Sequence, residues 1–160
     1  MNISIARPCF FMSLYFPGKV ASITASERDY LIITNNPLAF ECMKDRYQFD
    51  YRPEASYREI LVVARDMVYM GHTLYTHPLS GSVKPNETPY KSVVVSRVPH
   101  GFEADQAEII ANAVVAYDKF KPLGRVLTEK ILEDFQLVDY TLISGGIGFD
   151  AVAGLSAIKK

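Results

Sequence analysis

The segment Tyr30-Leu31-Ile32-Ile33-Thr34-Asn35-Asn36-Pro37 joins a run of β-branched residues directly to a helix-start signal. The run Tyr30–Thr34 is typical of a strand that is buried on both faces. Asn36 is a favoured N-cap residue, and Pro37 suits the first helical position because its fixed φ is already helical and its missing donor is not needed there. We therefore predict a strand over 30–34 and a helix over about 38–46.

Further helix and strand signals follow along the chain. Ser56-Tyr57-Arg58-Glu59 has the spacing of a capping box, in which the serine and the glutamate satisfy each other's backbone donors. It predicts a helix to about Met70, with Gly71 as its left-handed cap. Asp105-Gln106-Ala107-Glu108 has the same spacing and predicts a helix to about Phe120. The remaining predicted elements are strands over 47–49, 73–76 and 92–96 and a last helix over 125–144.

The alternation of these elements predicts the fold class. Strands separated by helices of this length favour an α/β fold, with a single layered domain and a mainly parallel sheet flanked by helices. We expect this domain to occupy residues 29–145. Residues 1–28 would be an extension, and residues 146–160 a loose C-terminal tail that begins at the glycine-rich Ser144-Gly145-Gly146-Ile147-Gly148.

The composition is that of an ordinary globular protein. A chain of 160 residues is most simply one domain, and 49% apolar with 22% charged residues makes disorder a poor description. The net charge of −1 gives no general attraction to nucleic acids or to anionic lipids, so we expect neither as a partner. No apolar run reaches the roughly 18 residues of a transmembrane helix.

The two cysteines and the N-terminal residues bear on localisation. Cys9 and Cys42 lie far apart, which indicates neither a zinc site nor a disulfide framework and favours a reduced, cytoplasmic protein. The apolar residues between Arg7 and Phe16 imitate a secretory signal, although Pro17-Gly18-Lys19 interrupts the pattern. An extra strand, a non-essential extension and a translation start further along are the alternatives.

A turn-rich polar segment spans residues 76–92. Its three prolines exclude a regular helix and stiffen a defined loop, and loops on a rigid scaffold usually carry binding or catalysis. Glycine amides, hydroxyls and lysines together can hold a carboxylate or a phosphate, so we predict a small-anion site here. The alternative is that these side chains only hydrogen-bond the loop's own backbone. The candidate ligand-binding residues of the loop are His77, Ser80, Ser82, Lys84, Asn86, Glu87 and Lys91.

Residues at the predicted strand ends extend this site. In open parallel sheets, ligands gather beyond the carboxyl ends of the strands. Asn35 follows the first strand, the loop follows another and Arg97 follows a third, so we expect all three on one rim. Asn36 belongs to the same candidate site, although its N-cap role alone is enough to explain it.

The last predicted helix carries a carboxylate inside its apolar stripe. At about 100° per residue, Asp139 projects about 40° from Phe135. An unpaired buried carboxylate is costly, and Arg65 lies at the edge of the apolar face of the helix that starts after Ser56. We predict a buried pair between Arg65 and Asp139. It is either purely architectural, or Arg65 grips a ligand carboxylate or phosphate while Asp139 orients it.

The histidines do not form a metal-binding pattern. His72 and His77 would point to opposite faces of an extended segment, and no cysteine or His-Glu-x-x-His motif accompanies them. We therefore expect no metal and no cofactor. His77 is either a proton donor or acceptor near neutral pH or a structural residue. No nucleophile motif such as Gly-x-Ser-x-Gly is present, so catalytic residues stay unassigned.

Several of these motifs together resemble the GrdX family. The resemblance covers roughly residues 29–145, and that family is encoded beside the glycine, sarcosine and betaine reductase systems of amino-acid-fermenting anaerobes. It implies an accessory protein whose partner is a component of those reductases. The resemblance rests on Thr34-Asn35-Asn36-Pro37, Ala64-Arg65-Asp66, Gly71-His72, the loop string from His77 to Ser92, Asp134-Phe135-Gln136 and Asp139.

Two hypotheses from different classes follow. In the first, the domain is a small-molecule enzyme or binding protein for a carboxylated or phosphorylated metabolite, which it holds through Arg65, the loop and Asn35. In the second, it is a non-catalytic accessory protein whose loop docks on a reductase component. We favour the accessory role with a small-anion pocket retained inside it. The ligand, any reaction and the oligomeric state, a homo-oligomer included, stay open.

Overall fold

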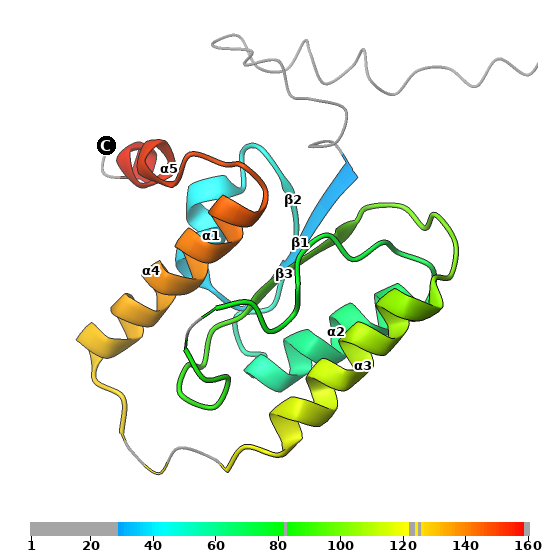
Figure 1. The fold of residues 1–160 in the computed structure, drawn as a ribbon. Helices are drawn as coiled ribbons and strands as arrows, with labels where there is room; N and C mark the ends of the chain where they lie inside the picture. The colour runs from blue at the N-terminus through cyan, green and yellow to red at the C-terminus, as the bar shows by residue number, and fades with distance from the viewer. Residues whose placement is uncertain (1–28, 82, 122–123, 125, 159–160) are drawn as a thin grey trace, which may run out of the picture.

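The computed structural model describes residues 29–81, 83–121, 124 and 126–158. Three strands and five helices lie in these ranges (Figure 1). In chain order they are β1 (Tyr30–Thr34), α1 (Pro37–Met43), β2 (Gln48–Tyr51), α2 (Tyr57–Tyr69), β3 (Ser92–Ser96), α3 (Ala104–Asp118), α4 (Glu129–Gly146) and α5 (Ala151–Ile158).

The strands form a small mixed sheet in the order β2-β1-β3. β1 pairs with β2 in parallel and with β3 in antiparallel orientation, so that Ile32 lies opposite Phe49 on one side and Val94 on the other. The fold is therefore α/β, as predicted, but the expectation of a mainly parallel sheet is wrong. β1, β2 and β3 confirm the predicted strands over 30–34, 47–49 and 92–96, with the second shifted by one or two residues.

The direction of β3 follows from the route of the chain before it. After α2, the extended residues 72–76 run antiparallel along β3, with one bridge between Leu74 and Val95 and a hydrogen bond from Tyr75 N to Val94 O of 2.9 Å. The predicted strand over 73–76 is this segment. The chain then turns through the polar loop and enters β3 at the end of the sheet where β1 leaves. The loop therefore precedes β3 at the carboxyl end of β1.

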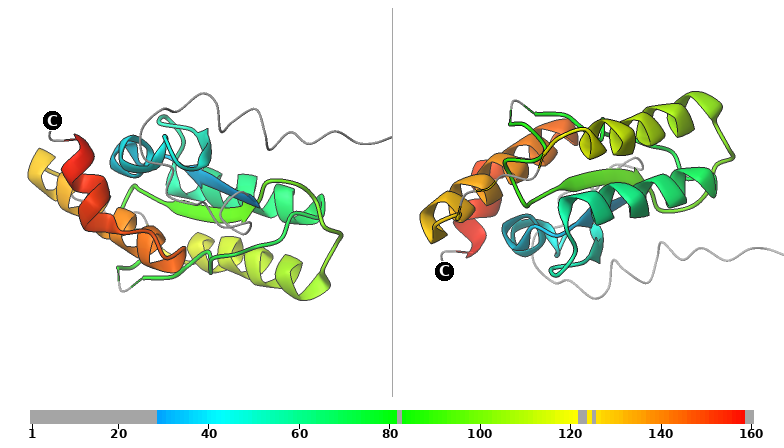
Figure 2. Two further views of the ribbon diagram at one scale, coloured as in Figure 1. Left: turned by 90° about the horizontal axis from the view of Figure 1, so that it is seen from above. Right: turned by 90° about the horizontal axis from the view of Figure 1, so that it is seen from below.

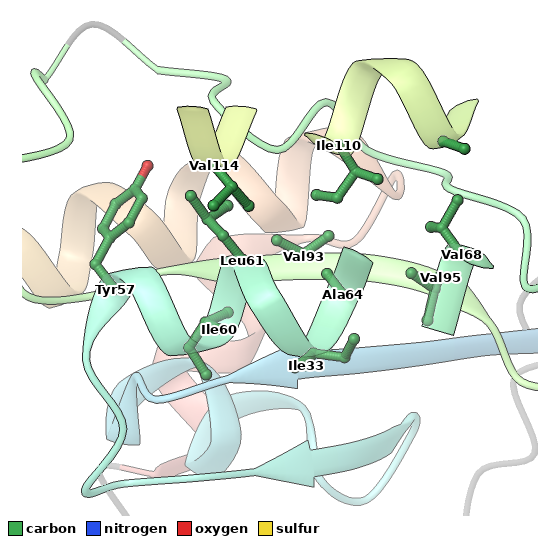
Figure 3. Packing of buried hydrophobic residues seen from close by; sticks show 11 residues of the cluster. Ile33, Tyr57, Ile60, Leu61, Ala64, Val68, Val93, Val95, Ile110 and Val114 are labelled. Atoms are coloured by element: carbon green, nitrogen blue, oxygen red, sulfur yellow. The ribbon is translucent and has the colours of Figure 1, made fainter. Parts of the chain in front are cut away.

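Helices cover both faces of the sheet. Because side chains alternate along a strand, Ile33, Val93 and Val95 face α2 and α3, whereas Ile32 and Val94 face α1, α4 and α5. Figures 1 and 2 show this arrangement, with α2 and α3 side by side on one side of the strands. Figure 3 shows the buried cluster on the side of α2 and α3. All five of these strand residues are fully buried.

Local sequence signals set most of the helix starts. The Asn36 side chain accepts hydrogen bonds from Leu38 N and Ala39 N, and both halves of the capping box of Ser56 and Glu59 are formed. These two predictions are confirmed, as is the left-handed Gly71, which has a φ of 97°.

The starts of the last two long helices differ from the prediction. The second capping box is wrong: α3 already begins at Ala104, with Glu103 as an N-cap that makes no side-chain capping bond. This places Asp105 inside the first turn instead of before it. α4 begins four residues later than predicted, because Thr128 Oγ1 accepts a hydrogen bond from Ile131 N and so caps the helix there.

The C-terminal segment contains a helix, α5, over Ala151–Ile158, which the sequence did not predict. α5 packs on α1 and α4 through Ala151 and Leu155, and Tyr140 Oη donates a hydrogen bond of 2.9 Å to Ala151 O. Gly154 lies so close to α4 that an added Cβ there would collide with Tyr140 Oη. Across the described ranges, no helix combines the length and the apolar character needed to span a membrane.

Candidate functional site

Buried polar residues gather where β1 ends and β3 begins. Asn35 and Asn36 lie there at the start of α1, Lys91 and Ser92 arrive from the polar loop, and Asp139 projects from the middle of α4. Each of these side chains is at most 8% exposed. Charged and amide groups in such a position need compensating contacts, which makes this cluster the centre of the candidate site.

Asp139 is satisfied by hydrogen-bond donors of the protein. Its Oδ1 accepts from Ser92 N at 2.9 Å, and its Oδ2 accepts from Ser92 Oγ at 2.6 Å and from Asn36 Nδ2 at 2.9 Å. The Ser92 hydroxyl also lies 2.7 Å from Thr34 Oγ1. Asp139 therefore fastens α4 to the first residue of β3 and to the cap of α1 without needing an arginine.

The predicted pair between Arg65 and Asp139 is wrong. Arg65 donates through Nε and Nη2 to the neighbouring Asp66 Oδ1, at 3.0 and 2.7 Å, on the partly exposed side of α2. The angular position of a residue gives the direction in which it projects from its helix axis. It does not give the face of the sheet on which that helix packs. α2 and α4 cover opposite faces of the sheet. Arg65 also lies eight residues, or about 12 Å along the helix, beyond Tyr57, the first residue of α2 and the one that approaches the site.

The two asparagines hold the site together. Asn35 Nδ2 donates to the carbonyl oxygens of Ala55 and Pro89, both at 2.8 Å, and Asn35 Oδ1 accepts from Lys91 N at 2.8 Å. Asn36, besides capping α1 and contacting Asp139, donates to Gln136 O at 2.9 Å. Their amides are engaged with the protein's own groups, which gives both residues a positioning role.

Lys91 is the unusual group of the cluster. It is 4% exposed, and its Nζ lies 5.8 Å from the centre of the Tyr57 ring. Among the residues that the structure describes, no hydrogen-bond or ion-pair partner is found for this nitrogen. Burial lowers the pKa of Lys91, while the nearby negative charge of Asp139 opposes that shift. Burial also raises the pKa of Tyr57, so its phenol is neutral.

Lys91 lines a small cavity of about 20 Å³ between the loop, α2 and α4. That volume accommodates about one water molecule. Its polar lining comes from Ser80, Thr88 and Asp139 besides Lys91, its apolar wall from Val83, Phe135, Val138 and Leu142, and its remaining lining from Gly81, Tyr57 and Tyr90. Tyr57 lies at one end of the buried cluster between the sheet and the helices α2 and α3, on the face of the sheet opposite to α4 (Figure 3).

The polar loop is fixed to both layers around this cavity. Gln136 Nε2 donates to Tyr90 Oη at 3.0 Å, which ties the loop to α4. Gly81 has a φ of 128°, and a Cβ there would lie 2.9 Å from Leu142 Cδ1. The loop thus closes directly on α4 at a position that only glycine accommodates comfortably.

The structure brings together only some of the predicted loop residues. Ser80 and Lys91 line the cavity, whereas the exposed Lys84 and the half-buried Glu87 form a turn in which Glu87 N donates to Lys84 O at 2.9 Å. Asn86 Nδ2 donates to Lys121 O at 2.8 Å, away from the lining. Ser82 lies outside the described residues.

The histidines and Arg97 lie elsewhere. His77 is exposed, accepts a hydrogen bond from Leu79 N at Nδ1 and borders a separate groove of about 320 Å³ on α3. His72 Nδ1 lies 2.7 Å from Ser96 O. The expectation of Arg97 on the same rim is wrong, because antiparallel β3 carries it to the opposite end of the sheet, where its N–H bonds Asp29 O. Within the described ranges, no three His, Cys, Asp or Glu side chains group closely enough to hold a metal ion.

Several residues that line the cavity were not among the predicted site residues. Tyr57, Thr88 and Tyr90 come from segments that were predicted as a capping box and as the polar loop, but without a role for these residues. Ser92 could have been predicted as a site residue, because it follows the predicted site residue Lys91 and begins a predicted buried strand.

Comparison with known families gives one result. The family model described as GrdX-like protein matches residues 31–148, a range that contains the whole cavity and its buried polar cluster. Among curated proteins and among solved structures, none matches the chain. Because the matched range covers more than half of the sequence, the chain belongs to the GrdX-like protein family.

Proposed function

We propose that this protein binds a small anion at Lys91 and serves as an accessory protein of glycine, sarcosine or betaine reductase metabolism. The anion site is supported by the geometry of the cavity. The metabolic setting is supported by membership of the GrdX-like family. The family name is associated with the glycine, sarcosine and betaine reductase systems.

The observation that carries the anion site is the Lys91 ammonium. An ammonium group loses its hydration when buried and needs a replacement partner, or else it releases its proton. The ring of Tyr57 supplies a cation–π contact, and Asp139 adds an electrostatic attraction. Neither gives the nitrogen a hydrogen bond. An anion in the cavity would supply one.

The groups around Lys91 suit a ligand that is small and is enclosed on binding. Ser80 and Thr88 add hydroxyls to the same lining. A cavity of about 20 Å³ holds about one water molecule, so we expect the loop to move outward from α4 to admit a larger anion. In this motion Gly81 would move away from the Leu142 side chain, which it approaches closely enough that an added Cβ would lie 2.9 Å from Leu142 Cδ1.

A thermal-shift experiment tests the anion site. The protein is heated in a buffer free of carboxylate and phosphate, with acetate, phosphate, acetyl phosphate, glycine, sarcosine or betaine added in turn. A ligand at ten times its Kd is expected to raise Tm by about 3 °C or more. Lys91→Met, which removes the charge and keeps the chain length, should abolish the rise. Lys84→Met is the matched control, because this lysine of the same loop is exposed and does not line the cavity.

The result that would overturn the anion site is an unchanged Tm with every anion, or a rise that Lys91→Met retains in full. The accessory role is tested separately by size-exclusion chromatography of the purified protein mixed with purified reductase components. Co-elution is expected. Independent elution from every component would contradict the accessory role and leave the anion site standing.

A further inference from the structure

We infer that the ligand of the Lys91 cavity is a short-chain monocarboxylate, held with its carboxylate on Lys91 and its alkyl end against α4. The inference rests on the proposed anion site and names the chemical class of its ligand. It follows from how charge and apolar surface are divided within the cavity lining.

The charge of the lining favours a single negative charge on the ligand. Lys91 is the only basic residue among the described residues that line the cavity, and Asp139 is a carboxylate in the same lining. A monoanion can pair with Lys91 at one end of the cavity. A phosphate dianion or a dicarboxylate would place its second charge near Asp139 without a cation to meet it, and like charges in a buried site repel strongly.

The opposite wall of the cavity is apolar. Phe135, Val138 and Leu142 project from successive turns of α4, and Val83 contributes from the loop. Val138 and Leu142 are 37% and 42% exposed in the free protein, and a bound ligand would cover them. These side chains offer neither donors nor acceptors, so a charged group covered by them would lose its water without compensation. An alkyl group there gains from leaving water, by about fourfold in affinity for each CH₂ that becomes fully buried.

The Asp139 carboxylate is a poor binding partner for the ammonium group of a ligand. Asp139 already accepts three hydrogen bonds, from Ser92 N, Ser92 Oγ and Asn36 Nδ2. Oδ1 accepts one of these bonds and Oδ2 accepts two, so an amino acid bound by its carboxylate at Lys91 would have to place its ammonium on the one remaining acceptor position of Oδ1 or against the apolar wall. The cavity therefore discriminates against a zwitterion of the same size and shape.

Propionate and glycine form a matched pair for the test. They have the same number of heavy atoms and differ in a methyl group against an ammonium group. Isothermal titration calorimetry is performed with formate, acetate, propionate, glycine and phosphate on the full chain. We expect affinity to rise from formate to propionate, by about fourfold for the added CH₂ between acetate and propionate. Glycine and phosphate should bind at least tenfold more weakly than propionate.

Two variants show whether the cavity is responsible. Lys91→Met should remove binding of all carboxylates. Val138→Thr keeps the shape of a partly exposed helix residue and places a hydroxyl in the apolar wall, so it should weaken propionate binding more than formate binding and thereby lower the ratio of the two affinities. Circular dichroism confirms that each variant is folded.

The outcomes are distinguishable. Glycine or phosphate binding as tightly as propionate, with loss in Lys91→Met, would overturn the monocarboxylate assignment and leave the anion site intact. An unchanged ratio of propionate to formate affinity in Val138→Thr would also overturn it. If no anion binds, the proposed anion site itself fails, and the ligand assignment fails with it.

Discussion

At the scale of single residues, the site is organised by Asp139 and its donors. The carboxylate connects α4, the start of β3 and the cap of α1 through three hydrogen bonds, and all of the partners are buried. The position of Asp139 in an apolar stripe predicted a buried, paired carboxylate, and the burial is confirmed, but its partners are hydrogen-bond donors and not Arg65. The sequence did not predict these partners, since they lie 47 and 103 positions away along the chain.

Replacing Asp139 by alanine tests this role. The change leaves Ser92 N and Asn36 Nδ2 without their buried acceptor, so it should lower the free energy of unfolding by about 3 kcal/mol. Asp134→Ala on the exposed side of the same helix should stay within about 0.5 kcal/mol of the wild type. Urea unfolding followed by circular dichroism measures both. Equal effects of the two changes would contradict the role assigned to Asp139.

The pH dependence of stability reports on Lys91. Because burial lowers its pKa from the ordinary 10.5, the folded protein releases this proton at a lower pH than the unfolded chain does. Stability should therefore rise with pH between the lowered pKa of the folded state and 10.5. Lys91→Met should unfold at higher urea concentration than the wild type below this window, and the difference should vanish above it.

The measurement for that prediction is a series of urea unfolding curves at fixed ionic strength across pH 6 to 10.5, with Lys84→Met as the control. A difference between Lys91→Met and the wild type that stays constant over the whole range would contradict a lowered pKa. Anion binding should weaken over the same window, since the cation is lost as the pH rises.

At the scale of elements, the starts of α1 and α2 were predictable and the contacts between helices were not. Asn36 and the capping box of Ser56 act within a few residues of the chain, so their sequence patterns were sufficient to identify them. The packing of α5 on α4 depends on a close approach at Gly154, and nothing in the local pattern marks that glycine. For this reason, α5 was not predicted within the C-terminal segment 146–160.

Two glycine substitutions separate packing from helix propensity. Gly154→Ala should destabilise the protein by about 1–3 kcal/mol, because its Cβ would collide with Tyr140 Oη. Gly145→Ala in α4 has no neighbour within 4 Å of the added Cβ and should stabilise by about 0.5–1 kcal/mol. Thermal unfolding of both variants checks the opposite signs. Stabilisation by Gly154→Ala would contradict the close packing of α5.

At the scale of the whole molecule, the layered α/β class followed from the alternation of strands and helices, whereas the sheet topology did not. A strand buried on both faces has the same apolar pattern whether its neighbour is parallel or antiparallel. The direction of β3 is set by residues 72–76, which bring the chain back along the sheet before the polar loop. This return path places Lys91 beside Asn35 and sends Arg97 to the far end.

The same topology explains which part of the candidate site was predictable. The polar loop and Asp139 do meet at the end of β1, as expected from the position of the loop and the buried carboxylate. Arg65 and Arg97 were included because the face that each helix covers and the direction of β3 were unknown. The cation of the site is instead Lys91, which ends the loop and enters the sheet.

The most direct test of the central claim is a crystal structure of the protein grown with propionate. The carboxylate is expected within about 2.7–3.2 Å of Lys91 Nζ, with the methyl group against Val138 and Leu142. Gly81 should have moved away from Leu142 to admit the ligand. A cavity that holds only water at saturating propionate, or a propionate bound away from Lys91, would contradict the claim.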